Sequence, residues 1–171
     1  MSVEIRRLTG SSPGTGDDIT NSNTRLLASD THTTSGTSNA IRIPSSGTNY
    51  SYKCSLQLYY DGSGTGTVDN IRWFTDGVND LGTDVGLQVK TSSSYSQATG
   101  TEGVSGDEMT GGSDGFSYLE SSPLTISGSI TDPSNELFAD ILEKQITVGS
   151  DASTGVSGQE TGTFRYDSTI A

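Results

Sequence analysis

The clearest periodic pattern lies in residues 50–60, where apolar and polar side chains alternate. Its apolar positions, spaced two residues apart, are Tyr52, Cys54, Leu56, Leu58 and Tyr60. Successive side chains of a strand point to opposite faces, so this alternation predicts a strand with one buried face. Residues 61–66 read Asp-Gly-Ser-Gly-Thr-Gly, a turn composition, and residues 68–75 resume the strand pattern. The two strands are therefore predicted to form a hairpin.

Short apolar runs recur along the rest of the chain. Residues 85–89 predict a third strand, and further candidates cover residues 3–8, 24–28, 40–43, 116–119, 124–130, 141–148 and 161–166. Only residues 134–144 carry a helix signature. There Asp132-Pro-Ser-Asn-Glu resembles a helix start, and the apolar residues Leu137, Phe138, Ile141 and Leu142 follow it. This segment is predicted to form a short helical turn that crosses between sheets.

Eight to ten short strands without a long helical segment are typical of all-β folds. We expect residues 1–171 to form a single antiparallel β-sandwich domain, jelly-roll-like, with long loops rich in Gly, Ser and Thr. Residues 1–22 are a candidate for an extended N-terminal arm. Residues 97–115 contain six glycines and almost no bulky side chains, which predicts a long loop of functional importance.

Composition and charge narrow the choice of partners. Hydrophobic residues make up only 29% of the chain, which predicts a thin core. Nine basic against 21 acidic residues leave a net charge of −12, which repels nucleic acids and anionic membranes. Cys54 is the single cysteine, so no internal disulfide can form. The N-terminus has no apolar signal region and no stretch is long enough to span a membrane, so we expect synthesis in a cytosol without Sec export.

The residue types that catalysis needs are scarce. His32 is the single histidine and lies in a polar loop, and one histidine with one cysteine does not make a zinc site. Four carboxylates cluster along one loop, at Glu102, Asp107, Glu108 and Asp114, but no aromatic sugar subsite lies beside them. We therefore predict that the chain is not an enzyme.

No cofactor is expected, and calcium is the one alternative left open. Its oxygen ligands would come from the acidic turn at residues 76–84, through Asp76, Asn79, Asp80 and Asp84. The spacing differs from an EF-hand loop. Ordinary turn formation, in which Asp and Asn side chains bond to nearby backbone groups, explains the same residues and is favoured.

Two pairs of consecutive aromatic residues suggest a subunit interface. In Tyr59-Tyr60 and Trp73-Phe74 one ring of each pair has to face away from the core, and an outward ring needs cover. Tyr59, Trp73 and Phe74 are therefore interface candidates. Arg6 and Arg7 are candidates too, because positive charge in an acidic chain suits an acidic neighbour; ordinary solvated strand positions are the alternative.

Three segments of the sequence resemble parts of small β-sandwich structural proteins of tailed-phage virions. They are Ile-Arg-Trp-Phe-Thr-Asp-Gly-Val-Asn-Asp-Leu-Gly-Thr-Asp-Val at residues 71–85, Leu-Gln-Val-Lys-Thr at 87–91 and Thr-Gly-Thr-Phe-Arg-Tyr-Asp at 161–167. None is a catalytic or ligand motif. The resemblance implies a bacteriophage virion component that contacts other virion proteins and forms a homo-oligomer.

Within that class a capsid decoration or cement protein is the leading interpretation. A neck, collar or tail ring protein, with the loop 97–115 inserted between neighbours, is the first alternative. A carbohydrate-binding or adhesion sandwich is the second, with Tyr50, Tyr59, Trp73 and Tyr95 as candidate rings for stacking on sugars.

Overall fold

The computed structural model describes residues 2–63, 65–131 and 134–170, and almost all of their regular structure is β. The long strands are β1 (Ser2–Leu8), β4 (Cys54–Ser63), β5 (Gly66–Phe74), β6 (Val85–Ser92), β12 (Ser134–Gly149) and β13 (Thr163–Ile170). The short ones are β2 (Asp17–Asp18), β3 (Thr48–Tyr50), β7 (Gly100–Thr101), β8 (Ser105–Gly106), β9 (Ser113–Asp114), β10 (Leu124–Thr125) and β11 (Ile130–Thr131). One 3₁₀ turn, η1 (Gly115–Ser117), is the helical element of this part of the chain.

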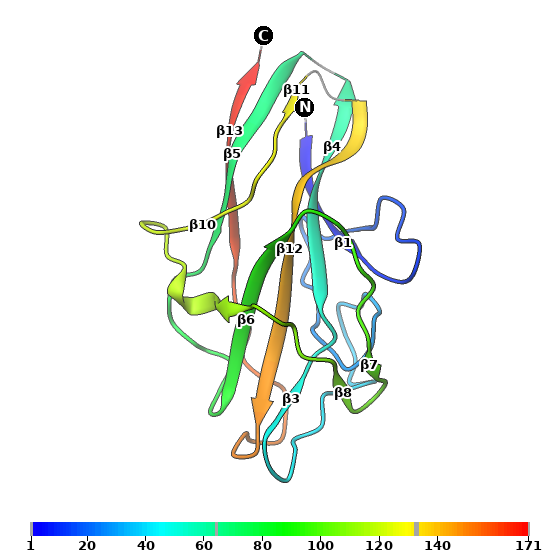
Figure 1. Cartoon of the computed structure of the whole chain (residues 1–171), viewed down its shortest axis with the longest axis vertical. Helices are drawn as coiled ribbons and strands as arrows, with labels where there is room; N and C mark the ends of the chain where they lie inside the picture. The colour runs from blue at the N-terminus through cyan, green and yellow to red at the C-terminus, as the bar shows by residue number, and fades with distance from the viewer. Residues whose placement is uncertain (1, 64, 132–133, 171) are drawn as a thin grey trace.

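The strands form two antiparallel sheets, which we call sheet A and sheet B (Figure 1). Sheet A runs β2-β1-β4-β12-β3-β8-β7, and β6 lies on the other side of β12 with β9 beyond it. Sheet B has β5 at its centre. Because Trp73 of β5 is paired with both Leu124 of β10 and Phe164 of β13, these two strands occupy opposite edges of β5. The predicted all-β antiparallel sandwich is confirmed, and the jelly-roll connectivity stays a prediction.

The central strand of sheet A replaces the predicted helical turn. β12 pairs with β4 on one edge and with β6 on the other, so its backbone groups are satisfied by ladders on both sides. Between Phe138 and Leu142, four steps on β12 face two steps on β4. This bulge, with Ala139 at φ 61°, produces the apolar spacing that resembles a helix. The helix prediction was wrong, and its start at residues 132–133 lies outside the described residues.

The predicted hairpin between residues 50–60 and 68–75 was also wrong. The strands exist, but β4 belongs to sheet A and β5 to sheet B, and they are not paired with each other. Each strand buries its own apolar face, with Leu58 and Tyr60 on β4 and Val68 and Ile71 on β5. The glycine-rich connection therefore carries the chain from one sheet to the facing one.

Several weaker strand predictions correspond to other structure. Residues 24–28 and 40–43 are irregular segments, held by isolated backbone bonds such as Tyr52 N–H to Leu27 O at 2.7 Å. Residues 116–119 overlap the 3₁₀ turn. At the N-terminus the residues expected to extend as an arm instead include β1, which pairs with β4 along its whole length, and β2, which pairs with β1. Edge-to-edge hydrogen bonding keeps this segment on the sheet.

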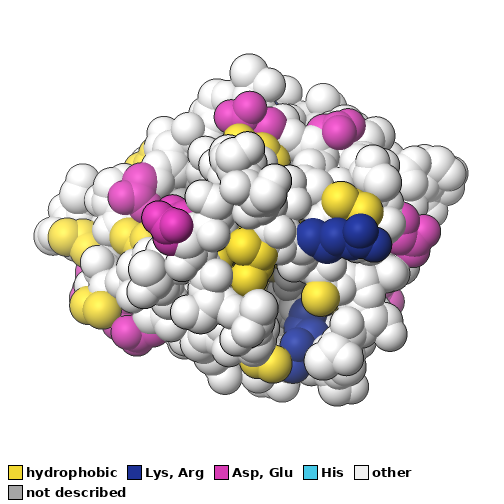
Figure 2. Space-filling view, turned by 90° about the horizontal axis from the view of Figure 1, so that it is seen from below, with side chains coloured by type: hydrophobic (Ala, Val, Ile, Leu, Met, Phe, Trp, Pro, Cys, Tyr) yellow, Lys and Arg dark blue, Asp and Glu magenta, His cyan; other side chains and the backbone are white. Residues whose placement is uncertain are grey.

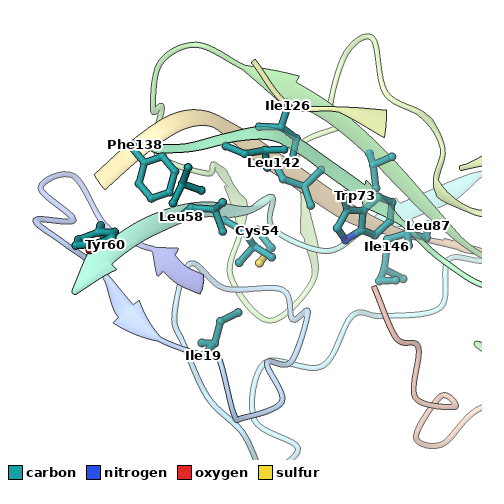
Figure 3. Packing of buried hydrophobic residues seen from close by; sticks show 14 of the residues in the cluster. Ile19, Cys54, Leu58, Tyr60, Trp73, Leu87, Ile126, Phe138, Leu142 and Ile146 are labelled. Atoms are coloured by element: carbon teal, nitrogen blue, oxygen red, sulfur yellow. The ribbon is translucent and has the colours of Figure 1, made fainter. Parts of the chain in front are cut away.

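The main core lies between the two sheets. The alternating residues of β4 all point inward, as predicted, and so do Val68, Ile71 and Trp73 of β5. Figure 3 shows Phe138 and Leu58 in one part of the cluster and Trp73, Leu87 and Ile146 in another. Burying such side chains contributes roughly 1.5–3 kcal/mol each, so this layer supplies most of the stabilisation.

The opposite face of sheet A has a second, polar interior beneath the loops. Gln145 is fully buried there; its side-chain oxygen accepts the Met109 N–H at 2.7 Å, and its amide donates to the carbonyls of Ser51 and Asp107 at 2.8 and 2.7 Å. Gly106 fits because a Cβ would lie 2.2 Å from the Ser51 carbonyl oxygen. Gln145 therefore anchors residues 107–109 of the glycine-rich loop 97–115 on sheet A, in addition to the pairing of β8 with β3 and of β9 with β6.

Candidate functional site

The outer face of sheet B carries an open groove of about 800 Å³, which we call the Phe74 groove. Its lining residues are Phe74, Thr75, Asp76, Leu119, Glu120, Ser121, Thr161, Thr163 and Arg165. The alternation along β5 explains its floor, because Trp73 points into the core and the next ring, Phe74, points out half-buried. Gly77 lets the 116–119 segment approach, since a Cβ there would lie 2.5 Å from a methyl of Leu119.

Charge is arranged across this groove. The Arg165 guanidinium lies 5.5 Å from the centre of the Phe74 ring and its Nη1 lies 3.0 Å from Oε1 of Glu120. Both side chains are accessible, with 40% of Arg165 and 73% of Glu120 exposed. Leu119, on the same wall, is 39% exposed. The groove therefore combines an apolar floor with an accessible ion pair, a composition typical of protein–protein contacts.

Two of the predicted interface residues lie in the interior of the subunit. Trp73 and Arg7 are each 1% exposed, so neither side chain is available to a neighbour. Trp73 packs where Gly162 passes, and a Cβ on Gly162 would lie 2.5 Å from its indole nitrogen. Arg7 donates to the Thr24 hydroxyl and, at 2.7 Å, to the Arg25 carbonyl, so it holds the 24–28 segment on the sheet.

Tyr59 and Arg6 lie together on the face of sheet A that points away from sheet B. The Arg6 guanidinium lies 4.5 Å from the centre of the Tyr59 ring, and Arg6 also forms an ion pair with Glu4. Both side chains are half-buried. Phe74 and Tyr59, each the outward ring of its aromatic pair, are therefore on different faces of the molecule, so the five candidates do not form one interface.

The four carboxylates of the loop 97–115 each have a separate local role. Glu102 accepts from the Asn39 amide at 3.0 Å, Asp107 from the Thr99 hydroxyl at 2.7 Å, and Asp114 from the Phe116 N–H at 3.0 Å. Glu108 lies beside Tyr50. Burial first, and this carboxylate second, raise the pKa of the Tyr50 phenol. The four groups stabilise the loop and do not converge on a shared point.

The candidate calcium ligands are also separated. Asp76 lines the Phe74 groove, whereas Asn79 and Asp84 line a different depression of about 490 Å³ beside Tyr50 and Gln88. Asp76 accepts the Val78 N–H at 2.8 Å, Asn79 the Leu81 N–H at 3.0 Å and Asp84 the Asp151 N–H at 2.9 Å. These are turn and loop bonds. Within the described residues no group of three or more His, Cys, Asp or Glu is placed to hold a metal ion.

The remaining candidates have structural surroundings. His32 Nδ1 lies 3.2 Å from the Thr24 hydroxyl, and Cys54 is 1% exposed in the core. The Tyr95 hydroxyl donates to the Gly10 carbonyl at 2.7 Å, and burial raises the pKa of Tyr95 to about 12. That ring therefore ties two loops together. At the end of the molecule seen in Figure 2 the hydrophobic side chains are separated by neutral ones, with no continuous apolar surface in that view.

Sequence reasoning missed a buried ionic cluster on the polar side of sheet A. Glu143 is 1% exposed, its Oε1 lies 2.6 Å from the ammonium of Lys53, and its Oε2 lies 3.3 Å from that of Lys90. Lys144 lies on the other face of the same strand, toward sheet B. It is paired with Cys54 on β4 and Val89 on β6, and burial lowers its pKa. A Glu-Lys pair inside an apolar run was the available signal.

Comparison with known proteins provides no relative: no protein family, no curated protein and no solved structure matches this chain. In the part of the chain that the structure describes, no helix is both long and apolar enough to cross a membrane.

Proposed function

We propose that this chain is a non-enzymatic structural component of a bacteriophage virion, most simply a capsid decoration or cement protein. Besides the resemblance of residues 71–85, 87–91 and 161–167, the observation that supports an assembly role is the Phe74 groove. Two of these three segments, 71–85 and 161–167, contribute to the groove. Its lining includes Phe74, Asp76, Thr161, Thr163 and Arg165.

The groove suits a protein neighbour better than a sugar. An aromatic ring that binds a sugar presents an open face, whereas the guanidinium of Arg165 lies over Phe74. An accessible Arg beside an aromatic and a leucine is a typical centre of a protein interface. In this proposal a segment of a capsid protein packs on Phe74 and Leu119. A charged side chain of that segment replaces either Arg165 or Glu120 in the ion pair. The net charge of −12 keeps the free subunit soluble before assembly.

The test is cosedimentation of the purified chain with tailed-phage capsids from which outer proteins have been removed. The wild-type chain should pellet with the particles. Phe74→Ala should reduce binding by about tenfold or more, because a ring at the centre of an interface carries at least about 1.4 kcal/mol. Tyr59→Ala is the matched control, as it removes an outward ring from the other sheet.

If the wild-type chain does not cosediment with the particles, the proposal is wrong. A glycan array, run with and without calcium, then tests the carbohydrate-binding alternative. An equal loss of particle binding in Phe74→Ala and Tyr59→Ala would show that the Phe74 groove is not the contact surface.

A further inference from the structure

The edges of the two sheets are protected unequally. Sheet A ends in the two-residue strands β2, β7 and β9, and one edge of sheet B ends in β10 and β11, which are equally short. The other edge of sheet B is β13, eight residues long, whose one strand partner among the described residues is β5. Short edge strands are a common protection against unwanted pairing, and a long one exposes a row of backbone N–H and C=O groups.

β13 is also regular enough to pair. Its register against β5 shifts between Arg165 and Asp167, where two steps on β13 face three on β5, from Arg72 to Asp69. The extra residue therefore belongs to β5, in which Asn70 has a φ of 53°. A bulge in an edge strand blocks pairing by bending it, but here the bulge lies in the inner strand and leaves β13 uninterrupted.

Within the subunit, the charges of β13 face like charges. Arg165 is directly opposite Arg72 on β5, and Asp167 is directly opposite Asp69. Like charges directly opposite each other destabilise an antiparallel pair. Both side chains reach elsewhere for partial compensation, Arg165 to the exposed Glu120 and Asp167 to the Asn70 amide at 2.5 Å. A neighbour on the open edge that offers the opposite charge at each position would offset both repulsions.

We propose that this neighbour is a second copy of the chain, bound through antiparallel pairing of β13 with β13 about a two-fold axis at Tyr166. In this register Arg165 of each copy faces Asp167 of the other, so the favourable pair forms twice. Tyr166, which is 36% exposed, meets its own counterpart at the axis. A shift of the register by two residues, which keeps each side chain on its face of the sheet, puts Arg165 opposite Arg165 in one direction and Asp167 opposite Asp167 in the other. The charges therefore favour one register.

The result is one continuous sheet that joins the two copies of sheet B. A two-fold axis perpendicular to the sheet keeps the outer faces on one side. Both Phe74 grooves then point in the same direction, and a dimer binds a particle through two equivalent sites. The inference rests on the proposed function for this last consequence, whereas the dimer itself follows from the edge.

Sedimentation equilibrium of the full chain over a range of concentrations tests the pairing. The wild type should dimerise reversibly. R165D and D167R each turn two attractive pairs into repulsive ones and should weaken dimerisation by roughly tenfold or more. The double variant R165D/D167R restores opposite charges and should dimerise like the wild type. A wild-type monomer at all concentrations, or an oligomer that R165D leaves intact, would overturn the proposal.

Crosslinking tests the register independently of affinity. Y166C places two thiols opposite each other at the axis, so oxidation or a short bismaleimide should convert it to a covalent dimer. S168C is the control, because residue 168 faces Phe164 of the second copy. The native Cys54 is buried and present in both variants. Equal crosslinking of the two variants would contradict the proposed register.

The two proposals fail separately. A monomer that binds particles would remove the β13 dimer and leave the virion function standing. A β13 dimer that ignores particles would do the reverse.

Discussion

The two faces of sheet A line interiors of different chemistry. The face toward sheet B is apolar, with Leu58, Val89 and Leu142 at 2% exposure or less. The face beneath the loops buries Glu143 and Gln145 just as fully, at 1% and 0%. Strand β12 contributes to both. The first interior is held by burial of apolar surface, which has no preferred direction, and the second by hydrogen bonds and ion pairs that position particular loop segments.

The largest effect is expected from the apolar side. Trp73→Ala should lower the free energy of unfolding by about 3–5 kcal/mol, because it removes transfer energy and leaves a void against Gly162. Urea unfolding followed by circular dichroism measures this. Phe74→Ala, at the adjacent outward position, is the control and should cost less than about 2 kcal/mol. Equal losses would mean that the two rings are not divided between core and surface.

On the polar side, Gln145→Ala should cost about 2–3 kcal/mol, because the Met109 N–H and the carbonyls of Ser51 and Asp107 lose their partner. The same residue type provides a control in Gln57→Ala, since Gln57 makes one such bond, to the Ala139 carbonyl at 2.7 Å. Proteolysis of the loop 97–115 should accelerate in Gln145→Ala alone. An unchanged cleavage rate would show that Gln145 does not anchor the loop.

Lys144 is a polar residue on the apolar side, so Lys144→Met should leave stability at neutral pH equal or higher. Burial lowers the pKa of Lys144 in the folded state. Between that lowered pKa and the ordinary lysine value, the unfolded chain binds more protons, so wild-type stability rises with pH there. This rise should be absent from Lys144→Met when unfolding is measured across alkaline pH. Lys90→Met, which removes a partner of Glu143, should destabilise instead.

The smallest effect is expected at the surface. Glu120→Gln removes the ion pair with Arg165, and because both side chains are exposed, stability should change by less than about 1 kcal/mol. Thermal unfolding at low and high salt provides the measurement. A larger loss would identify this pair as structural and would weaken its assignment to a partner surface.

Local pattern was sufficient where side-chain alternation and burial coincide. The β4 positions from Cys54 to Tyr60, and with them the outward position of Tyr59, follow from a period of two. For Trp73 and Phe74 the same period required one outward ring but did not decide which of the two it is. The pattern failed at β12, because the bulge beside Ala139 reproduces helical spacing. It also predicted the wrong partner for β4, which pairs with β1 and β12 and not with β5. Alternation shows which face of a strand is buried but carries no information about the neighbouring strand.

The sequence by itself determined the all-β class, the strand faces and the scarcity of catalytic side chains, since these depend on residue type and on spacing over a few positions. Tertiary structure alone decided which sheet each strand joins, that Arg7 and Trp73 are interior, and that Gln145 and Glu143 are buried beneath loops. It also left β13 with β5 as its one strand partner among the described residues and placed like charges opposite each other along that pair. Those properties depend on contacts between residues far apart in the chain, which local periodicity does not encode.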